Sequence, residues 1–292
     1  MNSAIEVKNL KKYFGQVKAL DGINFLVNEG EIFGFLGPNG AGKTTTIRCM
    51  MDFLRPTSGT IKVLGQDSQK DSVEIKQITG HLSGDIKLYD GWTGEDHINL
   101  VAKMKGDGDY AFDLAKRLDF DPKIKVYYLS TGNKQKLGLI LALMGKPKIL
   151  ILDEPTVGLD PLLQNEIYQT LKDLQKQETT IFMSSHNLAE VEKICERVGI
   201  IRSGKIVAVE NIETLKQKAI YEVMVYFDQK ISFDDFKIDG IQNIEQIHET
   251  GIKFNVKKDI NPIFKKLSQY NIKDIKISRA SLDEIFLEYY GK

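Results

Sequence analysis

The stretch "GPNGAGKTTT", from Gly37 to Thr46, decides the fold of this chain. It follows the apolar run "EIFGFL", which is typical of a buried strand, and it leads into "TIRCMMDFL", which is typical of a helix. Gly37, Gly42, Lys43 and Thr44 have the phosphate-loop spacing, in which backbone N–H groups turn inward around phosphate oxygens. A plain glycine-rich turn is the alternative, but the flanking strand and helix favour a loop that binds a nucleoside triphosphate.

The side chains of this loop suit different parts of such a ligand. Lys43 would reach the β and γ phosphates, and Thr44 would place its hydroxyl on Mg²⁺. The helix expected from about Thr45 directs the positive end of its dipole at the anion. We expect the nucleotide to be bound by Asn39, Gly40, Gly42, Lys43, Thr44 and Thr45.

A second apolar run, "PKILILDEP", ends in two carboxylates, Asp153 and Glu154. Its aliphatic residues predict a strand buried on both faces, as in a parallel sheet covered by helices. The carboxyl end of such a strand emerges beside the phosphate loop, because ligands of open α/β sheets lie there. We expect Asp153 to hold Mg²⁺ and Glu154 to polarise the attacking water. An isolated Asp-Glu pair after a strand is more often the solvated start of a loop. The presence of the phosphate loop in the same chain favours a catalytic role for this pair instead.

The composition of the chain limits the classes of protein to which it can belong. The chain has 292 residues, and 40 Lys and Arg balance 40 Asp and Glu, so bulk charge gives no reason to expect nucleic acid. Cys49 and Cys195 have no partner at metal-binding spacing, which indicates neither a zinc site nor a disulfide framework and favours a reduced, cytoplasmic setting. The charged N-terminal segment does not have the pattern of a signal peptide, and no apolar run reaches the ~18 residues of a membrane span.

Further motifs follow in a fixed order. "LSTGNKQK" contains Ser130 and Gly132, "GLDP" contains Asp160, and "MSSHNLAEVEKICERVGII" contains His186. Tyr13 lies near the start, in "KKYFG". Alone, Tyr13 would be a strand aromatic and His186 a core histidine. With all of these motifs present in this order, residues 4–215 resemble the nucleotide-binding domain of ABC transporters, in the branch of bacterial drug and lipid exporters.

This resemblance implies both a fold and a mechanism. The fold would be an α/β phosphate-loop NTPase core of mainly parallel sheet flanked by helices, and the ligands would be ATP and Mg²⁺. Tyr13 would stack on adenine. Ser130, Gly132 and Asp160 would close over the ATP of a second copy of the chain, so that each site is completed across a dimer. Glu154 and His186 would carry hydrolysis, which lets the two copies part.

One position departs from the family pattern. In "HLSGDIKLYDGW" the family usually has a glutamine that contacts Mg²⁺ and the attacking water, and Gly84 occupies that place here. Glycine offers no amide, so either Asp85 takes over part of the role as a metal ligand or the loop relies on backbone groups. We interpret the departure as a feature of the exporter branch.

Residues 88–145 are expected to form a helical subdomain. Thr93 and Asp96 have the spacing of a capping pair before "EDHINLVAKMKG", and "DYAFDLAKRLDF" predicts a second amphipathic helix. By resemblance this region docks a short cytoplasmic helix of a membrane partner, for which Leu88, Tyr89 and Trp92 are the candidate contacts. Ordinary packing is the alternative for this apolar group.

The pattern changes after about residue 215, so we expect two domains, 1–217 and 218–292. "YEVMVYF", "GIKFNV" and "IKDIKIS" predict strands, "NPIFKKLSQY" a helix, and Ser281 with Glu284 a capped final helix. This small α/β domain has no cluster of chemically reactive side chains, so packing or dimer bracing is the default role.

Two functions remain open. The first is an ATPase subunit on the cytoplasmic face of the membrane that powers an exporter together with separately encoded permease subunits. The second is a soluble regulatory or nucleic-acid-linked ATPase of the same superfamily. The short span from Lys43 to Glu154, without heptad repeats, and the balanced charge favour the first function and no nucleic-acid partner. A binding module without hydrolysis is disfavoured because Glu154 and His186 are both present.

Overall fold

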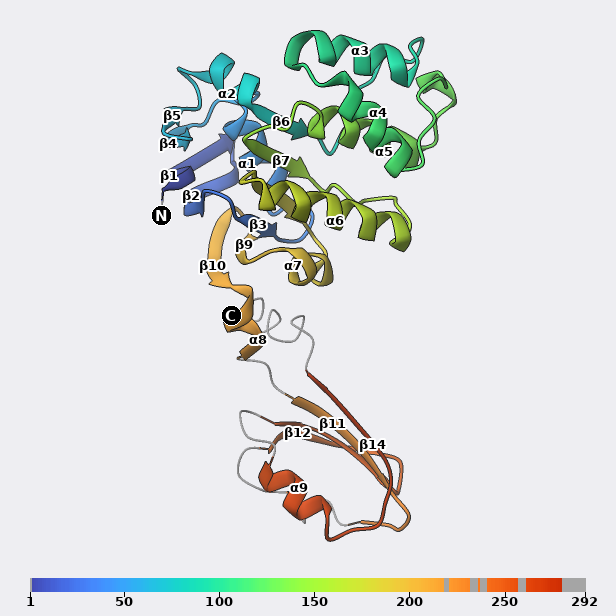
Figure 1. The fold of residues 1–292 in the computed structure, drawn as a ribbon. Coiled ribbons are helices and arrows are strands. Elements are labelled where there is room, and N and C mark those ends of the chain that lie inside the picture. The colour runs from blue at the N-terminus through green and yellow to red at the C-terminus, as the bar shows by residue number, and fades with distance from the viewer. Residues whose placement is uncertain (1, 218–220, 232–235, 237–240, 257–260, 280–292) are drawn as a thin grey trace. The chain divides into compact units, whose positions relative to one another are not determined.

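The computed structural model describes residues 2–217, 221–231, 236, 241–256 and 261–279 (Figure 1). Contacts between residues divide the chain into two compact units, Met1–Glu210 and Asn211–Lys292. The division lies a few residues before the boundary expected at 217/218. In the part of the chain that is described, no helix combines the length and the apolar character needed to cross a membrane.

A six-stranded sheet forms the centre of the first unit, and its order is β10-β9-β3-β8-β7-β6. β3 pairs in parallel with β8 and β9, and β7 pairs in parallel with β6 and β8. Every residue of β3, β7 and β8 is buried, and the sequences of β3 and β7 are accordingly runs of apolar residues, whereas β8 also buries the hydroxyl side chains of Thr180, Ser184 and Ser185. The strands are β3 (Ile32–Leu36), β6 (Thr79–Leu82), β7 (Ile149–Asp153), β8 (Thr180–Ser185), β9 (Arg197–Arg202) and β10 (Lys205–Asn211).

A four-stranded sheet, which the sequence reading did not predict, packs beside the first. Its order is β2-β1-β4-β5, and all its pairs are antiparallel. The strands are β1 (Ser3–Phe14), β2 (Val17–Asn28), β4 (Ser58–Val63) and β5 (Gln66–Asp67). Phe25 of β2 joins the two sheets, because its ring lies 5.2–6.0 Å from those of Phe33, Phe35 and Phe182. This aromatic cluster holds the strand before the phosphate loop in place.

Helices surround the sheets, and α3, α4 and α5 form a separate group at the upper right of Figure 1. This group is the expected helical subdomain, and Thr93 caps α3 in the predicted capping box with Asp96. Ala111, Leu114 and Ala115 of α4 are buried, as its amphipathic pattern predicts. The helices of this unit are α1 (Lys43–Met50), α2 (Ser72–Ile78), α3 (Gly94–Lys105), α4 (Gly108–Arg117), the 3₁₀ helix η1 (Val126–Tyr128), α5 (Thr131–Leu143), α6 (Pro161–Lys176) and α7 (Leu188–Ile194).

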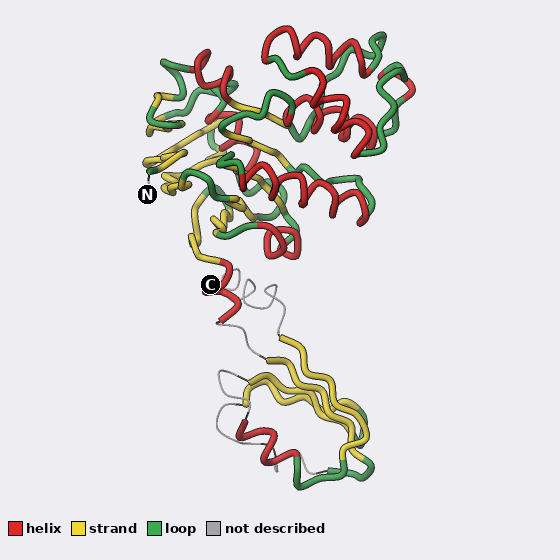
Figure 2. The backbone as a smooth tube through the Cα atoms, in the orientation of Figure 1, coloured by secondary structure: helices red, strands yellow, loops and turns green. Residues whose placement is uncertain are grey.

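The second unit is a four-stranded antiparallel sheet in the order β12-β13-β11-β14, with α9 along one face (Figure 2). Its core contains Val223, Phe236 and Phe254. Its elements are α8 (Ile212–Gln217), β11 (Tyr221–Phe227), β12 (Ile241–Ile247), β13 (Gly251–Val256), α9 (Asn261–Leu267) and β14 (Ile272–Arg279). The predicted strands and helix are present, β12 was missed, and the helix predicted to follow Ser281 lies outside the described residues.

Candidate functional site

The phosphate loop connects the carboxyl end of β3 to the first residue of α1, Lys43. A pocket of about 150 Å³ opens there and is lined by Ala19, Asn39, Gly40, Gly42, Lys43, Thr44, Thr45 and Glu154. All of these except Ala19 are residues that the sequence predicted for the site. Gly42 has φ +112°, and a Cβ at this position would lie 2.8 Å from the carbonyl oxygen of Ala19, so close packing and backbone conformation both require glycine.

Lys43 is the buried cation of the pocket, with an exposed fraction of 5%. Its Nζ donates to the carbonyl of Gly37 at 2.7 Å and lies 3.2 Å from a carboxylate oxygen of Glu154. These two contacts hold the ammonium group at the mouth of the loop. A buried charge paired in this way is ready to exchange its partners for the oxygens of an anionic ligand.

Thr44 and Asp153 meet beside this pocket. The Thr44 hydroxyl donates to Asp153 Oδ2 at 2.7 Å, and the Ser184 hydroxyl donates to Asp153 Oδ1 at 2.5 Å. The structure therefore brings together the two side chains that the sequence assigns to Mg²⁺. Their donor set of one hydroxyl and one carboxylate oxygen fits the oxygen ligands that Mg²⁺ prefers.

Glu154 and His186 form the second predicted pair. Nδ1 of His186 lies 2.9 Å from Glu154 Oε2, while the other oxygen of the carboxylate faces Lys43. Glu154 has φ +51°, a left-handed conformation that is uncommon outside glycine and needs support from its surroundings. Ser184 Oγ accepts the Glu154 N–H at 3.1 Å, and the amide of Gln135 donates to the Glu154 carbonyl at 3.2 Å.

Tyr13 lies outside the residues that line this pocket. Its hydroxyl donates to Asp21 at 2.7 Å, and the ammonium group of Lys18 lies 5.6 Å from its ring centre. The hydrogen bond to Asp21 raises the pKa of Tyr13 and lowers the pKa of Asp21. The ring is therefore fixed at its hydroxyl end.

Ser130, Gly132 and Asp160 lie at helix starts and do not line the pocket. Ser130 is exposed and caps α5 by accepting the N–H of Asn133 at 3.2 Å. A Cβ on Gly132 would lie 3.4 Å from the carbonyl of Gly158. Asp160 caps α6 by accepting two N–H groups at 3.0 Å. Within one copy, neither helix start contributes a residue to the lining of the phosphate-loop pocket.

Gly84 lies against the proposed metal site, whereas Asp85 points to other partners. A Cβ on Gly84 would lie 3.1 Å from Asp153 Oδ2. The Asp85 side chain is largely exposed and pairs with Lys87 at 3.0 Å. The structure does not bring the Asp85 carboxylate to Asp153 or Thr44.

The sequence reading missed three residues that support the site. Ser184 holds Asp153 and Glu154, and Gln135 connects α5 to the carbonyls of Glu154 and Pro155. Glu190 is a buried carboxylate behind the same loops, with an exposed fraction of 5%. All three lie within the quoted motifs "LSTGNKQK" and "MSSHNLAEVEKICERVGII", but the sequence alone assigned them no role, because their contacts with the segment from Asp153 to Thr156 form only in the fold.

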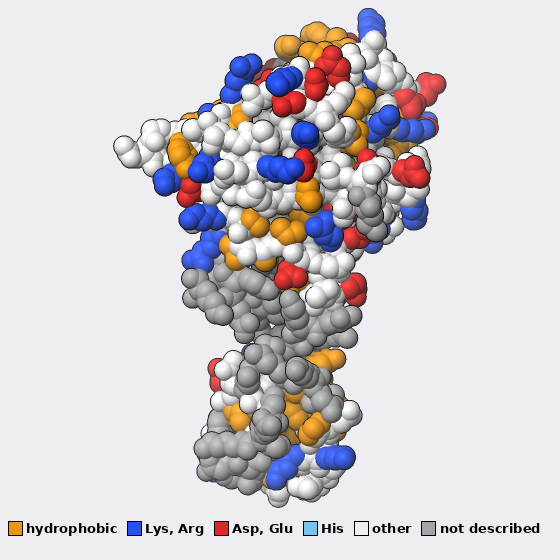
Figure 3. All heavy atoms as spheres, turned by 90° about the vertical axis from the view of Figure 1, so that its left-hand side faces the viewer, with side chains coloured by type: hydrophobic (Ala, Val, Ile, Leu, Met, Phe, Trp, Pro, Cys, Tyr) orange, Lys and Arg blue, Asp and Glu red, His pale blue; other side chains and the backbone are white. Residues whose placement is uncertain are grey.

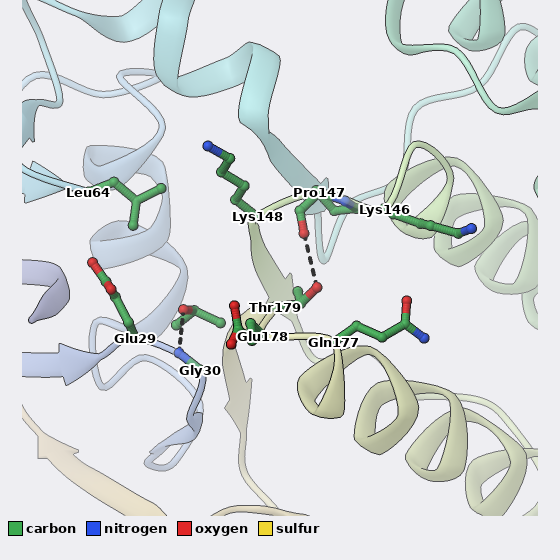
Figure 4. Close-up of a pocket in the computed structure, with 10 residues that line it drawn as sticks. Glu29, Gly30, Leu64, Lys146, Pro147, Lys148, Gln177, Glu178 and Thr179 are labelled. Carbon is green, nitrogen blue, oxygen red and sulfur yellow. Dashed lines mark hydrogen bonds between the residues drawn. The ribbon is translucent and has the colours of Figure 1, made fainter. Parts of the chain in front are cut away.

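A larger pocket, of about 710 Å³, lies at the amino ends of the parallel strands, opposite the phosphate loop (Figure 4). Its two threonines already bond to the backbone, since Thr180 Oγ1 accepts the Gly30 N–H at 2.9 Å and the Thr179 hydroxyl donates to the Pro147 carbonyl at 3.1 Å. The surface view in Figure 3 shows basic side chains interspersed with acidic ones on the face toward the viewer.

Comparisons with known proteins agree with this geometry. Residues 20–157 match the family model described as "ABC transporter". The whole chain is 32% identical to the bacitracin transport ATP-binding protein BcrA of Bacillus licheniformis and covers 98% of it. It is 30% identical, over 99% of its length and 98% of the relative, to the linearmycin resistance ATP-binding protein LnrL of Bacillus subtilis.

A solved structure gives the same result for the fold. The ATP-binding subunit of an ABC transporter superposes with a TM-score of 0.68 at 26% identity, over 74% of this chain and 92% of that subunit. The residues that match the family model, 20–157, include the phosphate loop, the paired carboxylates and the helical subdomain described above. This chain therefore belongs to the family of ABC transporter ATP-binding subunits, which are ATPases.

Proposed function

We propose that this ATPase powers an exporter, and that its hydrolytic site is completed by a second copy of the same chain. The observation that carries the proposal is the connected group formed by Lys43, Thr44, Asp153, Glu154 and His186. The group contains a cation for phosphate, a metal donor set and a base for water. It contains no second helix start facing the phosphates.

We assign each residue a role from its contacts or from the role that the family motif gives its position. Lys43 and the loop residues Asn39, Gly40, Gly42, Thr44 and Thr45 bind the phosphates of ATP, and Tyr13 stacks on the adenine. Thr44 and Asp153 hold Mg²⁺, which neutralises phosphate charge when bound. Glu154 accepts the proton of the attacking water, and His186 orients that carboxylate. For Asp85 to serve as a further metal ligand, its carboxylate would have to leave Lys87, with which it pairs at 3.0 Å.

The second copy supplies the missing side of the site. Ser130 and Gly132 lie at the exposed start of α5, a 13-residue helix whose N-terminal dipole favours an anion. In a two-fold dimer the same surface is used by both copies, so each α5 start would face the other copy's phosphates, with Asp160 at the seam. ATP then joins the two copies, and hydrolysis releases them.

A membrane partner would dock on the helical subdomain at the cytoplasmic face. Tyr89 and Trp92 are 63% and 38% exposed, and Leu88 is partly buried beside them. Tyr127 and Tyr128 of η1 are more than 70% exposed, and backbone hydrogen bonds connect their segment to Asp90 and Trp92. Exposed aromatic side chains in one region are typical of a protein-binding surface. The names of BcrA and LnrL, a transport and a resistance protein, support export.

The test is recovery of the partner. We would purify the tagged chain from detergent-solubilised membranes of its host and identify the bound proteins by mass spectrometry. A multi-span membrane protein in near-equal amount is expected, and the double variant Tyr89→Ala with Trp92→Ala should lose it. The variant Phe14→Ala is a matched control, since Phe14 is a 50% exposed aromatic of β1. Recovery of the chain alone under every detergent and nucleotide condition would support the regulatory ATPase instead.

A further inference from the structure

Glu190 is a buried carboxylate for which the proposed chemistry has no use. It lies on α7 with an exposed fraction of 5%, and its two oxygens accept hydroxyl groups from different segments. Thr156 donates to Oε1 at 2.6 Å, and Ser185 donates to Oε2 at 2.5 Å. Burial raises the pKa of Glu190 above its ordinary value. A carboxylate is costly to bury without such partners, so its position between two hydroxyls requires an explanation.

The two hydroxyl groups belong to the two catalytic segments. Thr156 follows Glu154 by two residues, and Ser185 directly precedes His186. One carboxylate therefore fastens the loop after β7 to the last residue of β8, next to His186. The side chains that these segments carry meet 2.9 Å apart, between Glu154 Oε2 and His186 Nδ1.

The loop after β7 needs a support of this kind. Glu154 has φ +51°, and a non-glycine residue keeps such a conformation when neighbouring structure holds it. Ser184 and Gln135 hold its backbone N–H and carbonyl. Glu190, acting through Thr156, holds the next turn of the same loop.

We infer that Glu190 is a positioning residue, which sets the distance between the Glu154 carboxylate and the His186 imidazole by clamping Thr156 and Ser185. The inference rests on the proposed roles of Glu154 and His186. Glu190 is not among the residues that line the phosphate-loop pocket, so its removal should lower the rate of hydrolysis and leave nucleotide binding intact. Displacements of about 1 Å at a catalytic group reduce rates by about 10²-fold, which sets the scale of the expected loss.

Glu31 offers a matched control. It is also buried, with an exposed fraction of 4%, and it is held by Asn28 and Arg197 at 2.7 and 2.8 Å. It precedes β3 at the amino end of the sheet, whereas Glu154 lies past the carboxyl end of β7. A role in stability alone would make the variants of Glu190 and Glu31 behave alike.

The experiment compares Glu190→Ala, Glu190→Gln, Glu31→Ala and Glu31→Gln by ATPase kinetics, fluorescent-nucleotide binding and thermal unfolding. Glu190→Ala should lower kcat by about tenfold or more, with KM and Kd within about threefold of wild type. Glu190→Gln should recover most of kcat, because its amide can accept one hydroxyl and donate to the other. The Glu31 variants should lower the melting temperature and keep kcat.

Other outcomes overturn the inference. An unchanged kcat in folded Glu190→Ala would show that the clamp is structural only. If that variant does not fold, Thr156→Val and Ser185→Ala, which each remove one contact, should lower kcat separately and non-additively together, and unchanged rates would contradict the role. A wild type that binds ATP without turnover would instead refute the proposed function on which the role depends.

Discussion

At the scale of single residues, the account depends on the two partners of Glu154. Its carboxylate faces Lys43 on one side and His186 on the other. In the proposed mechanism Lys43 binds phosphate and His186 orients the carboxylate, so nucleotide binding and proton transfer depend on different side chains. Nucleotide binding and proton transfer can therefore be separated by replacing one carboxylate oxygen of Glu154 with the nitrogen of an amide.

Replacing Glu154 by glutamine should abolish turnover and keep ATP binding. The amide cannot accept a proton, and loss of a general base lowers rates by about 10²–10⁴-fold. Lys43 stays in place through the Gly37 carbonyl, so the Kd for ATP should change by less than about threefold. The control Glu178→Gln, at an exposed position beside the larger pocket, should change neither quantity. Turnover near the wild-type rate in Glu154→Gln would exclude Glu154 as the base.

Cys49 provides a prediction about pH. Burial raises the pKa of its thiol from 9.0 to about 11, so the folded state favours the neutral form. The stability due to the neutral thiol is complete below the unfolded pKa near 9 and is lost as the pH rises through 11. Cys49→Ala has no thiol to titrate and should be less stable by about 1 kcal/mol at pH 8. Urea unfolding should show this difference shrinking between pH 9 and 11, and a constant difference would contradict the assignment.

At the scale of elements, the site depends on how strands present loops. β3 and β7 lie on either side of β8 in the sheet, and their carboxyl ends carry the phosphate loop and the paired carboxylates. Gly42, the residue before α1, allows the chain to leave β3 and begin the helix against β2.

Gly42→Ala should weaken nucleotide binding more than Gly40→Ala. Both glycines have positive φ, but a Cβ on Gly42 meets the Ala19 carbonyl at 2.8 Å, whereas a Cβ on Gly40 meets nothing within 4 Å. Backbone strain alone costs about 1–2 kcal/mol, and the clash adds to it at Gly42. Titration with a fluorescent ATP analogue should therefore show a Kd increase of about tenfold or more for Gly42→Ala and a smaller one for Gly40→Ala. Equal increases would show that the contact with Ala19 has no effect.

The sequence predicted those elements whose pattern is local. The buried runs of β3 and β7, the phosphate loop between β3 and α1, and the Thr93 capping box each occupy one short segment. β12 was missed because polar residues interrupt its apolar ones in "IQNIEQI". Glu190 was missed because a glutamate on a short helix is usually solvated, and its burial depends on Thr156 and Ser185 from other segments.

At the scale of the whole molecule, the proposal is that one copy holds two incomplete halves of a site. Ser130, at the start of α5, is exposed and is not among the residues that line the phosphate-loop pocket. Gln135 of α5 donates a hydrogen bond to the backbone carbonyl of Glu154. The helix whose start would contact the second copy is therefore bonded directly to the loop that carries Glu154 in the same copy. Closure of a dimer would therefore affect the position of the catalytic loop in both copies.

The most direct test of this account is ATP hydrolysis by a mixture of two inactive variants. Lys43→Ala removes the phosphate cation, and Ser130→Arg blocks the exposed start of α5, so each variant alone should be inactive. In mixed dimers one site combines both defects and the other is intact. Random pairing of equal amounts should therefore restore about one quarter of the wild-type sites. No recovery, under conditions in which the wild type is active, would contradict a site completed by a second copy.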